Sequence, residues 1–161
     1  MHIREKQHRL PDNNYKGEIS VAFTLCVENR FELFRNPSIV GIFTDILKAI
    51  VERFSCTVPA YCFMPDHLHL IVAGNSGNVD SLRCIKTYKQ KSGYWLAKHI
   101  NNACWQKDFY DHILRKDENL INVVKYILNN PVRQGLVAHW QDYPFKGSIG
   151  YSLDEILQSL V

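Results

Sequence analysis

Two histidines separated by one residue, His67 and His69, are the strongest chemical signal in the sequence. They belong to residues 67–72 (HLHLIV), an apolar run that predicts a β-strand. Because alternate side chains of a strand point to the same face, the two imidazoles should project together, about 7 Å apart at their backbones. Two imidazoles held side by side make half of a metal site. The alternative is a pair of partly exposed histidines on an ordinary strand.

Tyr126 is the second residue that could do chemistry. Residues 117–130 predict a helix, with Asp117 as its cap and an apolar stripe formed by Leu120, Val123, Val124, Ile127 and Leu128. Tyr126 lies outside this stripe, on a side that it shares with asparagines. Asn130 follows one turn later, so the two side chains can reach one point, although Pro131 disfavours helical geometry at Asn130. The alternative is an exposed tyrosine without a function.

A basic surface is the third feature. No acidic residue occurs between Asp80 and Asp108, and the helix predicted there has an apolar side that includes Trp95. The opposite side carries four cations, which are Arg83, Lys86, Lys91 and Lys98. A solvated helix usually mixes charges of both signs, so a face of one sign favours contact with a polyanion. The polar arm at residues 1–16 adds Arg4, Lys6 and Arg9. We expect the aromatic residues of this helix, Tyr94 among them, to pack rather than to stack on bases.

These residues together describe a site that cleaves phosphodiesters. A metal held by two imidazoles and a side-chain oxygen would polarise the phosphate, and the Tyr126 oxygen would attack phosphorus to form a covalent ester. A free phenol has a pKa near 10, so this attack needs an adjacent cation. The ester between the tyrosine and the DNA conserves the energy of the broken bond, so the strand can be rejoined. This property is typical of a transferase rather than a nuclease. Two alternatives remain: a non-catalytic nucleic-acid-binding module, and a histidine-based metallohydrolase for small phosphoesters.

The elements that position these residues predict an α+β fold in a single domain, residues 1–161. We expect strands at residues 20–27, 57–63, 67–73 and 105–112. A helix at residues 37–54 and the basic helix separate them, the tyrosine helix follows, and residues 138–161 form a tail. The order is β-α-β-β-α-β, a ferredoxin-like antiparallel sheet with helices on one face plus a C-terminal catalytic helix.

Composition narrows the class of protein. The 161 residues are 46% hydrophobic, enough for one proper core. We find no apolar run near the ~20 residues of a membrane span and no signal-peptide pattern, so we expect no membrane contact. The five cysteines are scattered without a C-x-x-C pair, which predicts reduced, buried thiols in a cytoplasmic protein. The net charge of +3 is too small to identify a partner.

Four segments resemble a known family. Residues 61–72 (YCFMPDHLHLIV) resemble the His-hydrophobe-His signature of single-tyrosine transposases. Residues 126–137 (YILNNPVRQGLV) resemble the tyrosine segment of one branch, the REP-associated tyrosine transposases. Residues 23–30 and 85–89 resemble the opening strand and the central helix of that branch. The resemblance extends from about residue 16 to residue 151, with the motifs in the right order.

The resemblance implies a ferredoxin-like fold, a divalent metal (Mg or Mn) and single-stranded or hairpin DNA as substrate. By position, His67 and His69 would be metal ligands, Asn130 the third ligand and Tyr126 the nucleophile of a 5′-phosphotyrosine intermediate. Insertion-sequence relatives often have glutamine at the place of Asn130. The branch recognises imperfect hairpins and is expected to act as a monomer, whereas insertion-sequence relatives form a homodimer with shared sites. Imidazole ligands by themselves suit manganese or zinc better than magnesium.

Overall fold

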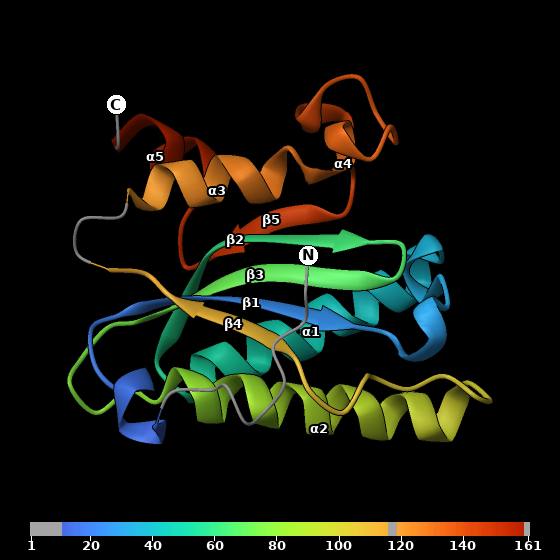
Figure 1. Ribbon diagram of the computed structural model, residues 1–161, viewed down its shortest axis with the longest axis horizontal. Helices are drawn as coiled ribbons and strands as arrows, with labels where there is room; N and C mark the ends of the chain where they lie inside the picture. The colour runs from blue at the N-terminus through green and yellow to red at the C-terminus, as the bar shows by residue number, and fades with distance from the viewer. Residues whose placement is uncertain (1–10, 116–118, 160–161) are drawn as a thin grey trace.

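The computed structural model describes residues 11–115 and 119–159, and an antiparallel sheet lies at its centre (Figure 1). Within the described residues the sheet has five strands in the order β4-β1-β3-β2-β5. They are β1 (Ser20–Cys26), β2 (Cys56–Met64), β3 (His67–Gly74), β4 (Tyr110–Ile113) and β5 (Lys146–Ile149). The order β4-β1-β3-β2, with helices between the strands, confirms the ferredoxin-like prediction.

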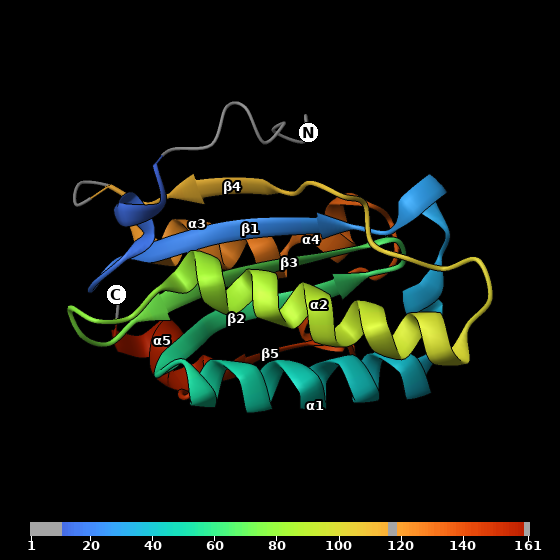
Figure 2. The same cartoon turned by 90° about the horizontal axis from the view of Figure 1, so that it is seen from below.

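Helices cover both faces of the sheet (Figure 2). On one face lie α1 (Pro37–Arg53) and α2 (Ser81–His99). On the other lie α3 (Leu120–Leu128), the short α4 (Asn130–Arg133) and α5 (Leu153–Ser159). Both long helices begin at capped residues: the Asn36 side chain accepts from the backbone N–H of Ser38, and Asp80 accepts from that of Arg83.

The alternation of β3 decides which of its side chains faces which layer. Leu68, Leu70 and Val72 are fully buried in the larger core, under α1 and α2. Ile71 belongs to the second cluster, under α3, and His67 and His69 share its face. Burying one leucine contributes roughly 1.5–3 kcal/mol, so a slip of β3 by one residue would be costly. The larger core therefore holds both histidines toward α3.

The fourth strand is shorter than predicted. Only residues 110–113 pair with β1, and Trp105 makes a single bridge to Val27. The segment between them forms a loop, whose carbonyls at residues 106 and 107 accept from the Lys89 ammonium. The Trp105 indole is buried and donates to Ser92 of α2 at 2.8 Å. Its apolar character therefore reflects packing on α2, not membership of a strand.

The C-terminal segment is more ordered than the predicted tail. Residues 138–161 contain β5, which extends the sheet beside β2, and α5, which packs on the second cluster through Ile156. The tyrosine helix is shorter than residues 117–130, because Asn119 caps it by accepting from the backbone N–H of Ile121. Asp117, the predicted cap, lies outside the described residues.

The structure bears on two further expectations, that the cysteines are reduced and buried and that no segment spans a membrane. All five cysteines are free; four are buried as predicted, and Cys104 is exposed. No helix within the described ranges combines the length and the hydrophobicity that a membrane crossing requires.

Candidate active site

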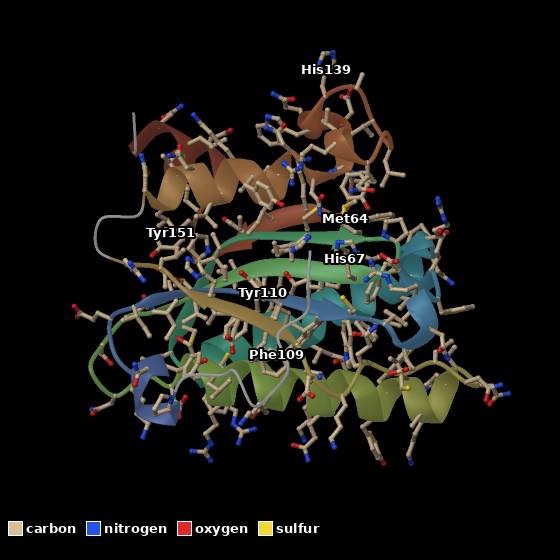
Figure 3. The ribbon with its side chains drawn as sticks, viewed as in Figure 1. Met64, His67, Phe109, Tyr110, His139 and Tyr151 are labelled. Carbon is tan, nitrogen blue, oxygen red and sulfur yellow. The ribbon has the colours of Figure 1, made fainter. Side chains whose placement is uncertain are left out.

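The two histidines are held by backbone pairing along their whole strand. β3 pairs with β1 in a continuous register that sets His67 opposite Cys26 and His69 opposite Thr24. Directly paired residues share a face, so these four side chains gather on the side of α3. Figure 3 shows His67 at the end of the sheet that lies near α4. His69 is 4% exposed and therefore sits at the bottom of the site.

A chain of polar contacts fixes the orientation of both imidazoles. Arg30 pairs with Asp66 at 3.2 Å, and the other Asp66 oxygen lies 2.6 Å from His67 Nδ1. Thr24 Oγ1 lies 2.9 Å from His69 Nδ1. Both Nδ1 atoms are thus engaged, and the two Nε2 atoms face each other at 3.1 Å. The carboxylate favours the tautomer of His67 with its proton on Nδ1, which leaves the Nε2 lone pair exposed to the site.

Burial keeps both imidazoles neutral. Desolvation lowers the pKa of His69 to about 3, and the charge of Arg133 and any protonation of His67 act in the same direction. Desolvation also lowers the pKa of His67, although the Asp66 carboxylate opposes this effect. Near neutral pH both rings are therefore in the state that binds metals.

Arg30 reaches the site through an unusual backbone conformation. The chain leaves β1 through Asn29 and Arg30, whose φ angles are 58° and 56°. Left-handed geometry is unfavourable for residues other than glycine and persists where surrounding contacts enforce it. The Arg30 guanidinium returns onto its own strand, where it donates to Cys26 Sγ at 3.2 Å besides pairing with Asp66. This turn converts a residue beyond the strand into part of the site.

The second half of the site comes from α3 and α4. The apolar side of α3, including Val124, Ile127 and Leu128, is buried against the sheet, and Tyr126 is 51% exposed. Asn129 keeps a helical conformation, so the chain continues directly into α4. Asn130 is the first residue of α4, which corrects the expectation that Pro131 would turn it away from helical geometry. Proline is tolerated in a first turn because that N–H would have no partner in the helix.

Both halves line one cleft of about 190 Å³. Its walls are Thr24, Cys26, Arg30, His67, His69, Tyr126, Asn130, Arg133 and Gln134. The structure thus brings together the four residues singled out for catalysis and metal binding. Their roles remain predictions. Two arginines beside the histidines make the cleft suitable for a phosphate.

The donor set of the cleft fits a divalent cation. The two Nε2 atoms lie 3.1 Å apart, and with each Nδ1 engaged by a neighbour they are the ring nitrogens left to bind a cation in the cleft. Within residues 11–115 and 119–159 no three histidine, cysteine, aspartate or glutamate side chains form a metal cluster. A third protein ligand would therefore be a hydroxyl or amide oxygen of the cleft. Asn130, 6% exposed in the same cleft, is placed to supply one.

The basic residues of α2 are not part of this cleft. Arg83, Lys86, Lys91 and Lys98 are exposed as predicted, but α2 covers the opposite face of the sheet (Figure 2). Arg4, Lys6 and Arg9 lie outside the described residues. Tyr94 contradicts the packing expectation, because it is 62% exposed. A role of α2 in DNA binding remains a prediction, now for a surface remote from Tyr126.

Sequence reasoning assigned no role to several residues of the site, among them Thr24, Arg30, Asp66 and Arg133. Asp66 and Arg133 stand inside the segments with family resemblance, so those motifs could have indicated them. Thr24 follows from strand pairing once the register of β1 on β3 is known. Arg30 stands inside the resembling segment 23–30, but only the left-handed turn shows that it reaches Asp66.

Comparison with known proteins agrees with this geometry. The model of the family described as "Transposase IS200 like" matches residues 16–130, which include β3 and Tyr126. The chain is therefore an IS200-like transposase, a class of enzymes that cleave and rejoin DNA.

Individual relatives define the branch. A REP-associated tyrosine transposase of Escherichia coli K12 is 30% identical over 130 residues, covering 76% of this chain and 72% of its own. A Haemophilus influenzae protein with a similar family description is 25% identical over 148 residues. This match covers 83% of this chain and 84% of the relative. A solved structure of a REP-associated tyrosine transposase bound to a REP hairpin superposes with a TM-score of 0.74 at 22% sequence identity. The superposition covers 88% of this chain and 82% of that chain. The chain belongs to the REP-associated tyrosine transposases.

Proposed function

We propose that this chain is a metal-dependent transesterase of single-stranded DNA that works through a 5′-phosphotyrosine intermediate at Tyr126. The observation that carries the proposal is the convergence of His67, His69, Tyr126 and Asn130 in one cleft. β3 supplies the histidines, whereas α3 and α4 supply the other two more than fifty positions later. Because one copy holds the whole set, we propose that a monomer carries a complete site. All five cysteines are free, which supports a cytoplasmic location.

The proposed metal site consists of His67, His69 and Asn130. Mg²⁺ or Mn²⁺ would bind there, and imidazole ligands favour manganese of the two. The bound cation would polarise the scissile phosphate and offset its developing negative charge. Asp66 and Thr24 keep the imidazoles oriented, since they engage both Nδ1 atoms.

Tyr126 performs the covalent step in this proposal. Its phenolic oxygen attacks phosphorus and forms the new P–O bond, while the bond from phosphorus to the 3′ oxygen breaks. The phenol gives up its proton and the departing 3′ oxygen gains one, so no redox partner is needed. Attack by the 3′ hydroxyl of another strand reverses the step and rejoins the DNA.

The proposed substrate is a REP-like hairpin with a single-stranded flank. Support comes from the related structure that is bound to a REP hairpin. Further support comes from the exposed cations of α2, on a helix that carries no acidic residue. We propose that these cations contact the DNA backbone on the face opposite the cleft.

The test is a covalent-adduct assay with labelled hairpin DNA and Mn²⁺. The wild-type chain should form a denaturant-resistant protein–DNA band, and Tyr126→Phe should abolish the band and the cleavage together. Stability should change by less than ~0.5 kcal/mol, because Tyr126 is half exposed. Tyr151→Phe, at another exposed tyrosine, is the matched control and should behave as wild type. Continued cutting by Tyr126→Phe would instead indicate a metal-dependent nuclease, and mapping of the adduct to another tyrosine would exclude this assignment.

A further inference from the structure

Arg133 makes the closest cation–ring contact within the described residues. Its guanidinium carbon lies 3.9 Å from the centroid of the Tyr126 ring, against at least 5.0 Å for the other pairs. Nη2 also donates to the backbone carbonyl of Tyr126 at 2.8 Å. One side chain thus holds both the ring and the backbone of the proposed nucleophile. A phenol fixed in this way has fewer orientations to lose before it attacks.

The rest of the guanidinium is available for a ligand. Nη2 makes one further, longer contact, 3.4 Å to Asn130 Oδ1. In the part of the chain that the structure describes, no carboxylate pairs with Arg133, and Nε and Nη1 have no hydrogen-bond partner. Arg30, the other arginine of the cleft, already shares its charge with Asp66. Arg133 therefore carries the less compensated positive charge beside Tyr126.

A purely structural role accounts for only part of this geometry. Arginines near helix C-termini often bond the last carbonyls, and the contact of Nη2 with Tyr126 fits that role. Capping alone does not require that the guanidinium stack on Tyr126 or line the same cleft as His69. A planar guanidinium offers parallel N–H donors that match two phosphate oxygens, which an ammonium does not.

We propose that Arg133 is a catalytic residue that holds the Tyr126 phenol in place and binds the non-bridging oxygens of the phosphate under attack. The inference rests on the function proposed above. Negative charge accumulates on those oxygens as the tyrosine–phosphorus bond forms and the bond to the 3′ oxygen breaks. A fixed donor therefore stabilises the transition state more than it stabilises the complex with uncleaved DNA. Loss of Arg133 should accordingly lower the rate of the covalent step more than the affinity for DNA.

The experiment measures single-turnover adduct formation at saturating hairpin DNA, together with DNA affinity by fluorescence anisotropy. Arg133→Gln should slow the covalent step by roughly 10²–10³, the usual effect of losing one oxyanion donor, with affinity changed only a few-fold. Arg133→Lys keeps the charge but lacks the planar pair of donors. Its rate for the covalent step should fall between the rates of Arg133→Gln and wild type. Arg53→Gln is the matched control, because Arg53 is exposed and contacts the Phe54 ring on the far face of the sheet.

A phosphorothioate series separates phosphate contact from support of the fold. Replacement of the oxygen that Arg133 binds by sulfur should slow the wild-type chain and have little further effect on Arg133→Gln. A structural role alone would leave the sulfur penalty equal in both proteins and so overturn the inference. A rate for Arg133→Gln within about three-fold of Arg53→Gln would overturn it as well. If Arg133→Gln melts early, Arg133→Lys carries the same comparison. Absence of any adduct with wild type would refute the proposed function instead.

Discussion

Acidification should destabilise the metal-free protein through His69. The pKa of this imidazole is about 3 in the folded chain and near 6.5 in a model compound. Between these values the unfolded chain binds more protons, so the free energy of unfolding falls as the pH falls. Each pH unit below 6.5 costs about 1.4 kcal/mol, which gives about 2 kcal/mol at pH 5. His67 contributes in the same direction, since burial also lowers its pKa.

The measurement is urea unfolding followed by circular dichroism in EDTA at pH 7, 6 and 5. His69→Gln replaces the imidazole by a side chain that does not titrate, so its stability should fall less steeply. The two curves should differ by roughly 1.4 kcal/mol per pH unit below 6.5, equivalent at pH 5 to a shift of about 4–8 °C in Tm. His139→Gln removes an exposed histidine (Figure 3) and should run parallel to wild type. Parallel curves for wild type and His69→Gln would show that burial does not keep His69 neutral.

Three other predictions concern the metal and the DNA. His67→Ala with His69→Ala should abolish Mn²⁺-dependent cleavage while unfolding stays cooperative; a loss of stability of about 1–3 kcal/mol is expected, because His69 is buried and hydrogen-bonded. Retained cleavage would exclude these ligands. Asp66→Asn should weaken Mn²⁺ binding by about 10–100-fold in calorimetry, because the carboxylate orients His67, and unchanged affinity would contradict that role. Lys86→Gln or Lys98→Gln should lower the salt slope of DNA binding by roughly 0.7 each for a single strand, whereas unchanged slopes would place the DNA elsewhere.

Local patterns in the sequence predicted the elements that carry the site. The alternation of β3 sets two histidines on one face and Leu68 and Leu70 on the other, because a strand has a period of two. The stripe of α3 leaves Tyr126 outside the buried side, because a helix has a period of 3.6. Both properties depend only on residues a few positions apart. The chain alone could therefore indicate them.

The tertiary structure decided which faces meet. The same periodicities would hold whichever face of the sheet α3 covered, and only the chain path after β4 sets Tyr126 beside His69. Packing of α2 on the other face keeps its cations away from the cleft, and the path after β4 turns the expected tail into β5 and α5. Arg30 enters the cleft through a left-handed turn that neighbouring contacts stabilise. Contacts between distant segments arise from the packing of the whole domain, so a pattern confined to one element does not encode them.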